Sequence, residues 1–334
     1  MEIQSDRTMT QQNTPDGTAP IVYAGADISK DTLDAHLTAW GQSRPFPNSP
    51  EGAAALLAAL PPGTHVLCEA TGGYERTLLA ACWGAGVPVS LLNPARVRSL
   101  AEAAGQLAKT DAIDAAVITL FGEKFDPDPT PAPSGAQEEL VAAFRHRERL
   151  VRLLAQLRGS RDRENDPYVL GSLADTIDLI DRQVGEIDGR IARIIGSDPG
   201  FSSLFERMTA VCGVGPVCAS AVLAEMPEIG TVSDRRASSL AGLAPFPKES
   251  GRRRGRRIIR GGRSRLRRAL YMPAMAARNH NPILREFYDR LVEKGKPHHV
   301  AITAVMRKLL CLLNRIAADP EFALAQTAKT TPVA

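Results

Sequence analysis

The stretch IVYAGADISKDTLDAHL, residues 21–37, opens the first ordered part of the chain and indicates how it folds. Residues 21–26 form a short apolar run, and residues 32–39 alternate loosely between apolar and polar side chains. This pattern predicts a strand, a turn and a second strand. Asp27 follows the first run directly, so we expect a carboxylate at the end of a buried strand.

Strands and helices alternate after this pair. We predict helices at residues 50–60, 74–85 and 94–104, strands at 65–70 and 87–92, and a further helix from about residue 110. Such alternation indicates an α/β domain, which we place at residues 21–127. Residues 126–135 are rich in proline and are interpreted as a linker between domains.

Residues 135–197 are predicted to be helical. An unbroken heptad series of apolar residues, with charges between its members, indicates a long amphipathic helix. The series consists of Leu170, Leu173, Ile177, Ile180, Val184, Ile187, Ile191 and Ile194. Residues 138–157 form the other arm of an expected helical hairpin or coiled coil, which could also pair with another subunit; a single helix packed on its own domain is the alternative. Residues 201–323 are predicted to form a mostly helical domain, and residues 1–20 and 324–334 to be disordered tails.

Composition excludes several classes of protein. The 334 residues give room for two or three domains, and 44% hydrophobic and 23% charged residues are ordinary for a globular protein. No apolar run approaches the roughly 18 residues of a membrane span, and the polar start does not resemble a secretory signal. The five cysteines contain no CxxC pair, which disfavours a disulfide framework or a zinc ribbon and fits a reducing cytoplasm.

Positive charge is concentrated in one place. Residues 252–268 contain ten arginines and no acid, so the rest of the chain carries a formal charge of −6, although the whole chain carries +4. This asymmetry indicates a polyanionic partner. Ile258 and Ile259 interleave with the charges, which favours an ordered element over a solvated charge run. We expect nucleic-acid contacts from Arg252, Arg253, Arg254, Arg256, Arg257, Arg260, Arg263 and Arg265.

Four acids of the first domain are candidate metal ligands. Asp27 and Glu69 end apolar strands, and Asp111 and Asp114 share a face near the start of a helix. Buried acids are costly unless they are solvated, paired or bound to cations, and Mg²⁺ prefers oxygen ligands. Two such ions, about 4 Å apart, activate an attacking oxygen and stabilise a leaving one. By spacing alone, ordinary turn, cap and helix-dipole roles are the more common explanation of such acids.

Two further motifs lie in the C-terminal part. In residues 209–225, TAVCGVGPVCASAVLAE, Gly213 and Gly215 stand between helical patterns, as in a helix–hairpin–helix motif that offers backbone N–H groups to a phosphate. A glycine-capped corner is the alternative. Ser250, beside the arginines, could attack a phosphodiester, although a Ser-Gly pair usually forms a turn. The other possible nucleophiles are Ser238, Ser239, Ser264 and Tyr271, the last of which is expected within a helix.

Together these segments resemble the DEDD transposases of the insertion sequence 110 family, relatives of the Piv invertases. The matching stretches are GADISKDTLDAHL (25–37), CEATGGY (68–74), KTDAIDA (109–115), CGVGPVCAS (212–220) and LAGLAP (240–245) with the serine and arginines after it. The resemblance runs from about residue 21 to residue 322. It implies a RuvC-like, RNase H-like domain whose acids match Asp27, Glu69, Asp111 and Asp114. It also implies a coiled-coil insertion and a second domain whose nucleophile matches Ser250.

The resemblance further implies strand exchange through a covalent serine–DNA intermediate, with Mg²⁺ at the acids and Mn²⁺ as the alternative ion. Family members are guided by a structured bridge RNA that pairs with donor and target DNA, and they act as homo-oligomers, dimers or tetramers. We therefore expect a cytoplasmic transposase or site-specific recombinase, associated with the nucleoid when bound to DNA. The alternatives are a RuvC-like metal-dependent junction nuclease, which forms no covalent adduct, and a non-catalytic nucleic-acid-binding relic.

Overall fold

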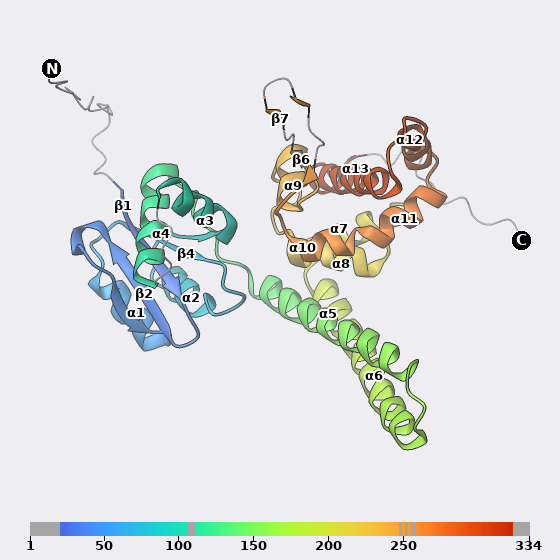
Figure 1. The fold of residues 1–334 in the computed structure, drawn as a ribbon, viewed down its shortest axis with the longest axis horizontal. Helices are drawn as coiled ribbons and strands as arrows, with labels where there is room; N and C mark the ends of the chain where they lie inside the picture. The colour runs from blue at the N-terminus through green and yellow to red at the C-terminus, as the bar shows by residue number, and fades with distance from the viewer. Residues whose placement is uncertain (1–20, 106–110, 247–248, 251–252, 255–257, 323–334) are drawn as a thin grey trace, which may run out of the picture. The chain divides into compact units, whose positions relative to one another are not determined.

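The structure is a computed structural model that describes residues 21–105, 111–246, 249–250, 253–254 and 258–322 (Figure 1). At residues 111–113, 249–250 and 253–254 it describes the backbone alone. The chain divides into two compact units, Met1–Ala132 and Pro133–Ala334. The tails expected at residues 1–20 and 324–334 lie outside the described residues.

A five-stranded mixed sheet with the order β3-β2-β1-β4-β5 forms the centre of the first unit (Figure 1). Its strands are β1 (Val22–Ile28), β2 (Thr32–Leu37), β3 (Arg44–Pro47), β4 (Thr64–Glu69) and β5 (Val89–Leu92). Strands β1, β4 and β5 run parallel, whereas β2 is antiparallel to both β1 and β3. Strand β3 was not predicted, because two of its four residues are prolines; prolines are tolerated there because β3 is an edge strand.

Helices cover both faces of this sheet. Helices α1 (Pro50–Ala59) and α2 (Arg76–Gly84) pack on one face, and α3 (Pro94–Ala103) and α4 (Asp111–Phe125) on the other. Between β2 and β3, Thr38–Trp40 forms a single 3₁₀ turn. The α/β fold expected for this part of the chain is confirmed, with each predicted strand and helix present within a few residues of its expected bounds.

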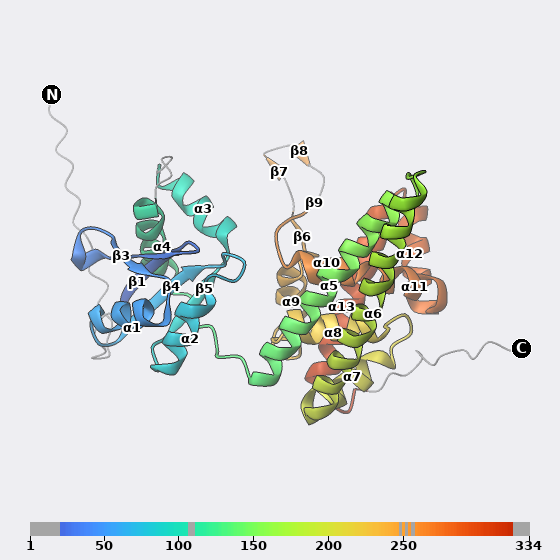
Figure 2. The same ribbon diagram turned by 90° about the horizontal axis from the view of Figure 1, so that it is seen from below.

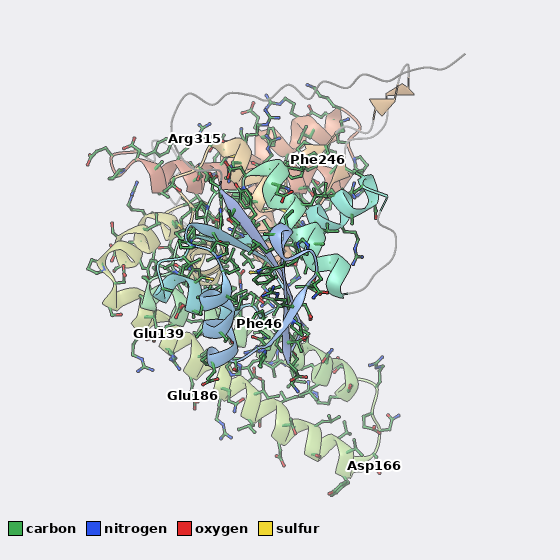
Figure 3. The ribbon with its side chains drawn as sticks, turned by 90° about the vertical axis from the view of Figure 1, so that its left-hand side faces the viewer. Phe46, Glu139, Asp166, Glu186, Phe246 and Arg315 are labelled. Carbon is green, nitrogen blue, oxygen red and sulfur yellow. The ribbon has the colours of Figure 1, made fainter. Side chains whose placement is uncertain are left out.

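The second unit begins with a long helical hairpin (Figure 2). Helices α5 (Gly135–Arg161) and α6 (Pro167–Ser197) lie side by side, and Asp166 at their junction caps the start of α6 (Figure 3). The heptad residues Ile177 and Ile180 pack against Leu150 and Leu154 of α5. The apolar stripe of α6 is therefore covered, over much of its length, by another helix of the same chain.

The rest of this unit is mostly helical, as expected. It contains α7 (Pro199–Thr209), α8 (Pro216–Glu225), α9 (Asp234–Leu240), α10 (Ser264–Ala269), α11 (Tyr271–His280), α12 (Pro282–Glu293) and α13 (His298–Ala318). Helices α8 and α13 contribute many of its buried side chains. None of the helices in the described part of the chain is long and apolar enough to cross a membrane.

A hairpin of short strands separates α9 from α10. Strand β6 (Pro245–Phe246) pairs with β9 (Ile258–Ile259), and β7 (Glu249–Ser250) pairs with β8 (Arg253–Arg254). Much of the arginine-rich segment thus belongs to this hairpin and to α10. Of the cysteines, Cys68, Cys82 and Cys218 are buried, whereas Cys212 and Cys311 are half-buried.

Candidate functional site

Two of the four predicted acids end neighbouring parallel strands. Asp27 lies near the end of β1, and Glu69 is the last residue of β4. The register pairs Ala26 with Cys68, so Asp27 and Glu69 are the next positions along the two strands. Ala26 and Cys68 are buried under α1 and α2. Because side chains alternate along a strand, both half-buried acids belong to the opposite face, which α4 covers.

Helix α4 is held close to β1 by two glycines. Gly25 in β1 lies directly under Ala115 and Thr119, so a Cβ atom there would collide with the helix backbone. Its N–H donates to the Thr119 hydroxyl at 3.0 Å. Further along the helix, Gly122 lies against the ring of Tyr23, which comes earlier in β1. The helix therefore runs antiparallel to β1, and its first turn lies toward the carboxyl end of that strand.

The other two predicted acids belong to this first turn. Asp111 is the first residue of α4 and its side chain lies outside the described residues, whereas Asp114 is half-buried. The backbone thus brings all four positions to one edge of the sheet, on one face. Among the described side chains, which exclude Asp111, no three acidic, histidine or cysteine side chains are grouped closely enough to hold a metal ion.

A further acid, Asp34, belongs to the same edge. The register places Asp34 of β2 directly opposite Asp27 of β1. Residues directly opposite share a sheet face, and like charges there repel. The half-buried Asp34 accepts a hydrogen bond from the Thr32 hydroxyl at 3.3 Å. A divalent cation would offset the repulsion, and carboxylate oxygens are donors that fit Mg²⁺ and Mn²⁺. Sequence alone does not identify this pair, because the partner of Asp34 depends on the register of the β1–β2 hairpin.

Ser250 lies in the hairpin between α9 and α10. Its direct cross-strand partner is Arg253; both side chains lie outside the described residues. In the adjoining pair, Phe246 is opposite Ile258, and their side chains are 45% and 51% exposed. Arg260, just beyond the second strand, is also exposed. The hairpin projects from the helices of its unit (Figure 1), and its described side chains form a surface that is both apolar and cationic.

The later arginines of the segment have partners within the protein. Arg263 donates two hydrogen bonds to the Glu228 carboxylate, at 2.6 and 2.5 Å. Arg265 and Arg268 of α10 pair with Glu148 of α5, at 3.1 and 3.5 Å. Burial acts to raise the pKa of Glu228, but the hydrogen bonds and charge of Arg263 outweigh it and lower that pKa. The side chains of Arg252, Arg253, Arg254, Arg256 and Arg257 lie outside the described residues.

The predicted helix–hairpin–helix motif corresponds to α7, a tight corner and α8. Gly213 has a φ of 94°, and a Cβ atom there would lie 2.7 Å from the Cβ of Ala277. Gly215 caps α8, and its carbonyl accepts from the Cys218 N–H at 3.0 Å. Close packing alone explains the first glycine, so phosphate binding at this corner stays a prediction. A cavity of about 540 Å³ opens beside the corner, lined by residues 206, 209–211 and 213–216.

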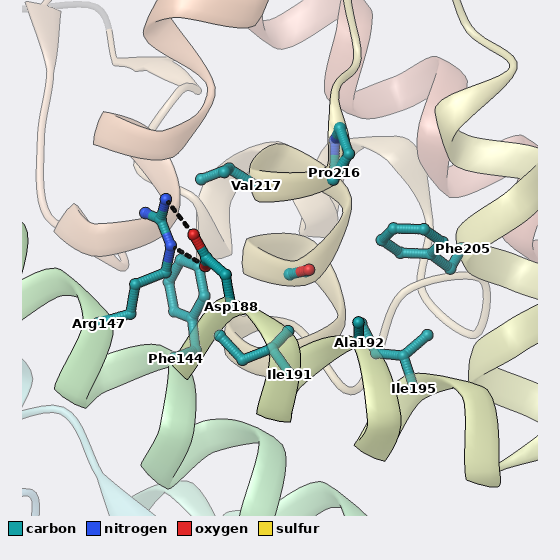
Figure 4. Close-up of a pocket in the computed structure, with 10 residues that line it drawn as sticks. Phe144, Arg147, Asp188, Ile191, Ala192, Ile195, Phe205, Pro216 and Val217 are labelled. Carbon is teal, nitrogen blue, oxygen red and sulfur yellow. Dashed lines mark hydrogen bonds and ion pairs between the residues drawn. The ribbon is translucent and has the colours of Figure 1, made fainter. Parts of the chain in front are cut away.

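A second, smaller cavity of about 180 Å³ lies between the helical hairpin α5–α6 and α8 (Figure 4). Its lining is mostly apolar, and includes Phe144 of α5 and Ile191 of α6. The Arg147–Asp188 ion pair, with a shortest distance of 2.5 Å, joins α5 to α6 at this point. This cavity contains none of the predicted site residues, and we assign it no part in the chemistry.

Comparisons with known proteins agree on one family. Residues 24–160 match the DEDD transposase family of insertion sequence IS110, and residues 206–289 match the family described as Transposase IS116/IS110/IS902. The pilin gene-inverting proteins of Moraxella bovis and Moraxella lacunata are each 29% identical, over 87% of this chain and 94% of their own length. A 42 kDa protein of insertion element IS900 from Mycobacterium paratuberculosis is 32% identical, over 50% of this chain and 41% of its own.

Proposed function

Because the chain belongs to the IS110 family of transposases and is thereby a DNA recombinase, we propose that it exchanges DNA strands through a covalent link to Ser250. The observation that carries the proposal is the convergence of Asp27, Glu69 and the first turn of α4 on one sheet edge. That edge would hold divalent metal, and Ser250 on its projecting hairpin would supply the nucleophile.

Members of the DEDD family generally use divalent metal ions. Here the ligands would be Asp27, Glu69, Asp111 and Asp114, in a domain of the RuvC-like, RNase H-like type. The oxygen-only donor set and the facing Asp27–Asp34 pair support Mg²⁺, with Mn²⁺ as its substitute. Bound there, the metal would neutralise negative charge that develops on the scissile phosphate.

Ser250 would act by transesterification. Its Oγ attacks the phosphorus, an Oγ–P bond forms, and the bond from phosphorus to the leaving sugar oxygen breaks. The serine proton passes to the leaving oxygen, and an incoming sugar hydroxyl reverses the step on another strand. The alternative Ser238 is fully buried and donates its hydroxyl to Asp234 O at 2.7 Å, so it could not reach a phosphodiester. Phe246 and Ile258, the paired residues of the adjoining strands, are exposed, which supports the choice of Ser250.

The surface that binds DNA would be the strand hairpin between α9 and α10 rather than the whole arginine segment. Arg260 is exposed, whereas Arg263 and Arg265 already have carboxylate partners. We therefore assign those two arginines to the support of α10. Phe246 and Ile258 would add apolar contacts to the bases. The proposed phosphate contacts are Arg252, Arg253, Arg254, Arg256, Arg257 and Arg260, with the Gly213–Gly215 corner as a second, sequence-independent contact.

The proposal includes a structured guide RNA, which pairs with donor and target DNA, and a dimer or tetramer. The guide RNA is proposed from the family resemblance alone. For the oligomer, the helical hairpin offers uncovered apolar side chains: Tyr168 at its tip is 85% exposed and Leu179 is 47% exposed. Both could pack in a coiled coil with a second copy.

Strand cleavage with and without metal tests the proposal. Protein purified with its co-expressed RNA is given donor and target DNA with Mg²⁺, denatured, and examined for DNA-bound protein. We expect a Mg²⁺-dependent adduct that Asp27→Ala and Ser250→Ala both abolish, while both variants still bind DNA. Cleaved DNA without adduct would favour a junction nuclease, and binding without cleavage would favour a non-catalytic protein.

A further inference from the structure

Asn48 joins the loops that follow two of the predicted metal ligands. It lies between β3 and α1, distant in sequence from both loops. Its amide nitrogen Nδ2 donates to the carbonyl oxygen of Ser29 at 2.8 Å and to that of Tyr74 at 3.1 Å. Ser29 comes two residues after Asp27, and Tyr74 comes five residues after Glu69. One side chain thus bridges the two acid-bearing segments.

The orientation of this amide is fixed by its partners. Both partners are carbonyl oxygens, which can only accept, so the Asn48 nitrogen must face them. The backbone N–H of Asn48 also donates to Asp31 O, at 2.9 Å. The remaining atom, Oδ1, is buried without a hydrogen-bond partner among the described residues. A buried amide oxygen without a partner is unfavourable, so packing alone does not account for an asparagine here.

The second loop has its own support in Glu75. This residue is 8% exposed, and its Oε2 accepts from the Thr71 N–H at 3.2 Å, the Thr71 hydroxyl at 2.8 Å and the Gly73 N–H at 2.7 Å. Gly72 and Gly73 have φ values of 86° and 136°, which favour glycine. Glu75 therefore fixes the turn between Glu69 and Tyr74, and Asn48 ties that rigid turn to the loop after Asp27.

We propose that Asn48 is a positioning residue that holds Asp27 and Glu69 at the separation at which both carboxylates can bind the same divalent metal. The inference rests on the proposed function, because it assumes metal at these acids. Asn48 itself touches neither metal nor DNA; it acts through the Ser29 and Tyr74 carbonyls. Without it, each loop could shift independently, although the strands that carry the acids would stay paired.

Direct Mn²⁺ binding, followed by electron paramagnetic resonance on the full-length protein, tests the proposal. Asn48→Ala removes both donated hydrogen bonds, and Asn48→Asp keeps the size but has no N–H to donate. We expect Mn²⁺ affinity to fall by about tenfold or more in both, as for other residues that support metal ligands. The matched control is Thr38→Ala, which removes a 2.7 Å hydrogen bond to Glu123 away from the acids and should leave affinity unchanged.

Asn48→Asp gives the sharper comparison. An added negative charge would tighten cation binding by Coulomb attraction alone, whereas the lost bridge should weaken it. Saturating Mn²⁺ should then restore strand cleavage in this variant, which it would not do for a general folding defect. Glu75→Gln, which keeps one acceptor oxygen, should lose less Mn²⁺ affinity than Glu75→Ala. This pair of variants tests the support of the loop after Glu69 if the Asn48 variants do not fold.

The outcomes are distinguishable. Mn²⁺ affinity in both Asn48 variants equal to that of the wild-type protein, or tighter binding in Asn48→Asp, would overturn the positioning role while leaving the metal centre intact. A wild-type protein that binds no Mn²⁺ would contradict the proposed metal centre, and the positioning role with it.

Discussion

Asp27 of β1 and Asp34 of β2 stand directly opposite each other, on the sheet face that α4 covers. Two carboxylates in this arrangement repel each other. The fold keeps this pair at the carboxyl end of β1, where Glu69 and the first turn of α4 also lie. We therefore expect this pair to lower the stability of the metal-free protein, and the proposed metal to offset that cost.

We expect Asp34→Asn to raise the melting temperature of the metal-free protein, because it removes one of the two facing charges. The stabilisation should be about 0.5 kcal/mol, within the range for a cross-strand charge pair. Thermal unfolding in EDTA measures it, and added Mg²⁺ should reduce the difference. Asp31→Asn, at an exposed position in the same hairpin, is the control. Equal effects of the two substitutions would argue against charge repulsion at Asp27.

Arg263 should be needed for folding stability rather than for DNA binding. Its two hydrogen bonds to Glu228 require a planar fork, which lysine lacks. Arg263→Lys should therefore lower the free energy of unfolding by about 1 kcal/mol, and Arg260→Lys should not lower it. Denaturant titration compares them. If Arg263→Lys leaves stability unchanged but weakens DNA binding, Arg263 contacts DNA and does not support the fold.

Salt dependence should separate the two kinds of contact on the hairpin. Arg260→Ala should reduce the slope of log affinity against log salt by about one, because one phosphate contact is lost. Phe246→Ala should leave the slope unchanged and weaken binding by about 1–3 kcal/mol at every salt concentration, as expected for a lost base contact. Fluorescence anisotropy with labelled DNA gives both quantities. A change of slope in Phe246→Ala, or none in Arg260→Ala, would refute the assignment.

Acid should destabilise the first unit through His65. Ser90 Oγ donates to Asp128 O at 2.7 Å, so His65 Nε2, 2.9 Å away, must donate to Ser90. Burial lowers the pKa of His65 below its ordinary 6.5, although the charge of Asp126 opposes this. As pH falls below 6.5, His65 is protonated in the unfolded chain before it is protonated in the folded protein. The free energy of unfolding that is present above this pH is therefore lost.

We therefore expect the melting temperature to fall between about pH 7.5 and about pH 5, and to fall less in His65→Gln. His146→Gln, at an exposed histidine of α5, should keep the wild-type pH dependence. A His65→Gln profile parallel to that of the wild-type protein would show that the histidine does not titrate in this range.

Local pattern was sufficient to predict most elements of this fold. Apolar runs and cap residues marked the strands and helices of the first unit, and the heptad spacing marked α6. Strand β3 could not be predicted from local pattern, because its pairing with β2 outweighs the low strand propensity of its prolines. The apolar runs also predicted that Asp27 and Glu69 lie at the ends of their strands. Neighbouring parallel strands present their carboxyl ends at the same edge of the sheet, so the two acids share that edge.

What sequence could not supply were contacts between distant residues. Asn48 meets Ser29 and Tyr74 only after the sheet has formed. Arg265 appeared as one of ten similar arginines, and its partner Glu148 lies 117 residues earlier in the chain. The sequence shows how many arginines a segment contains. Which of those arginines form ion pairs with acidic residues depends on how the helices pack.

The most direct test of the account is to identify the residue that carries DNA after strand cleavage. The reaction is stopped by denaturation, the protein is digested after its lysines, and tandem mass spectrometry locates the nucleotide adduct. We expect the adduct on Ser250, in a peptide that also contains Ser264 and Tyr271 as internal controls. An adduct on either of those residues, or on Ser239, would contradict the assigned nucleophile, and DNA cleavage with no adduct on any residue would contradict covalent recombination itself.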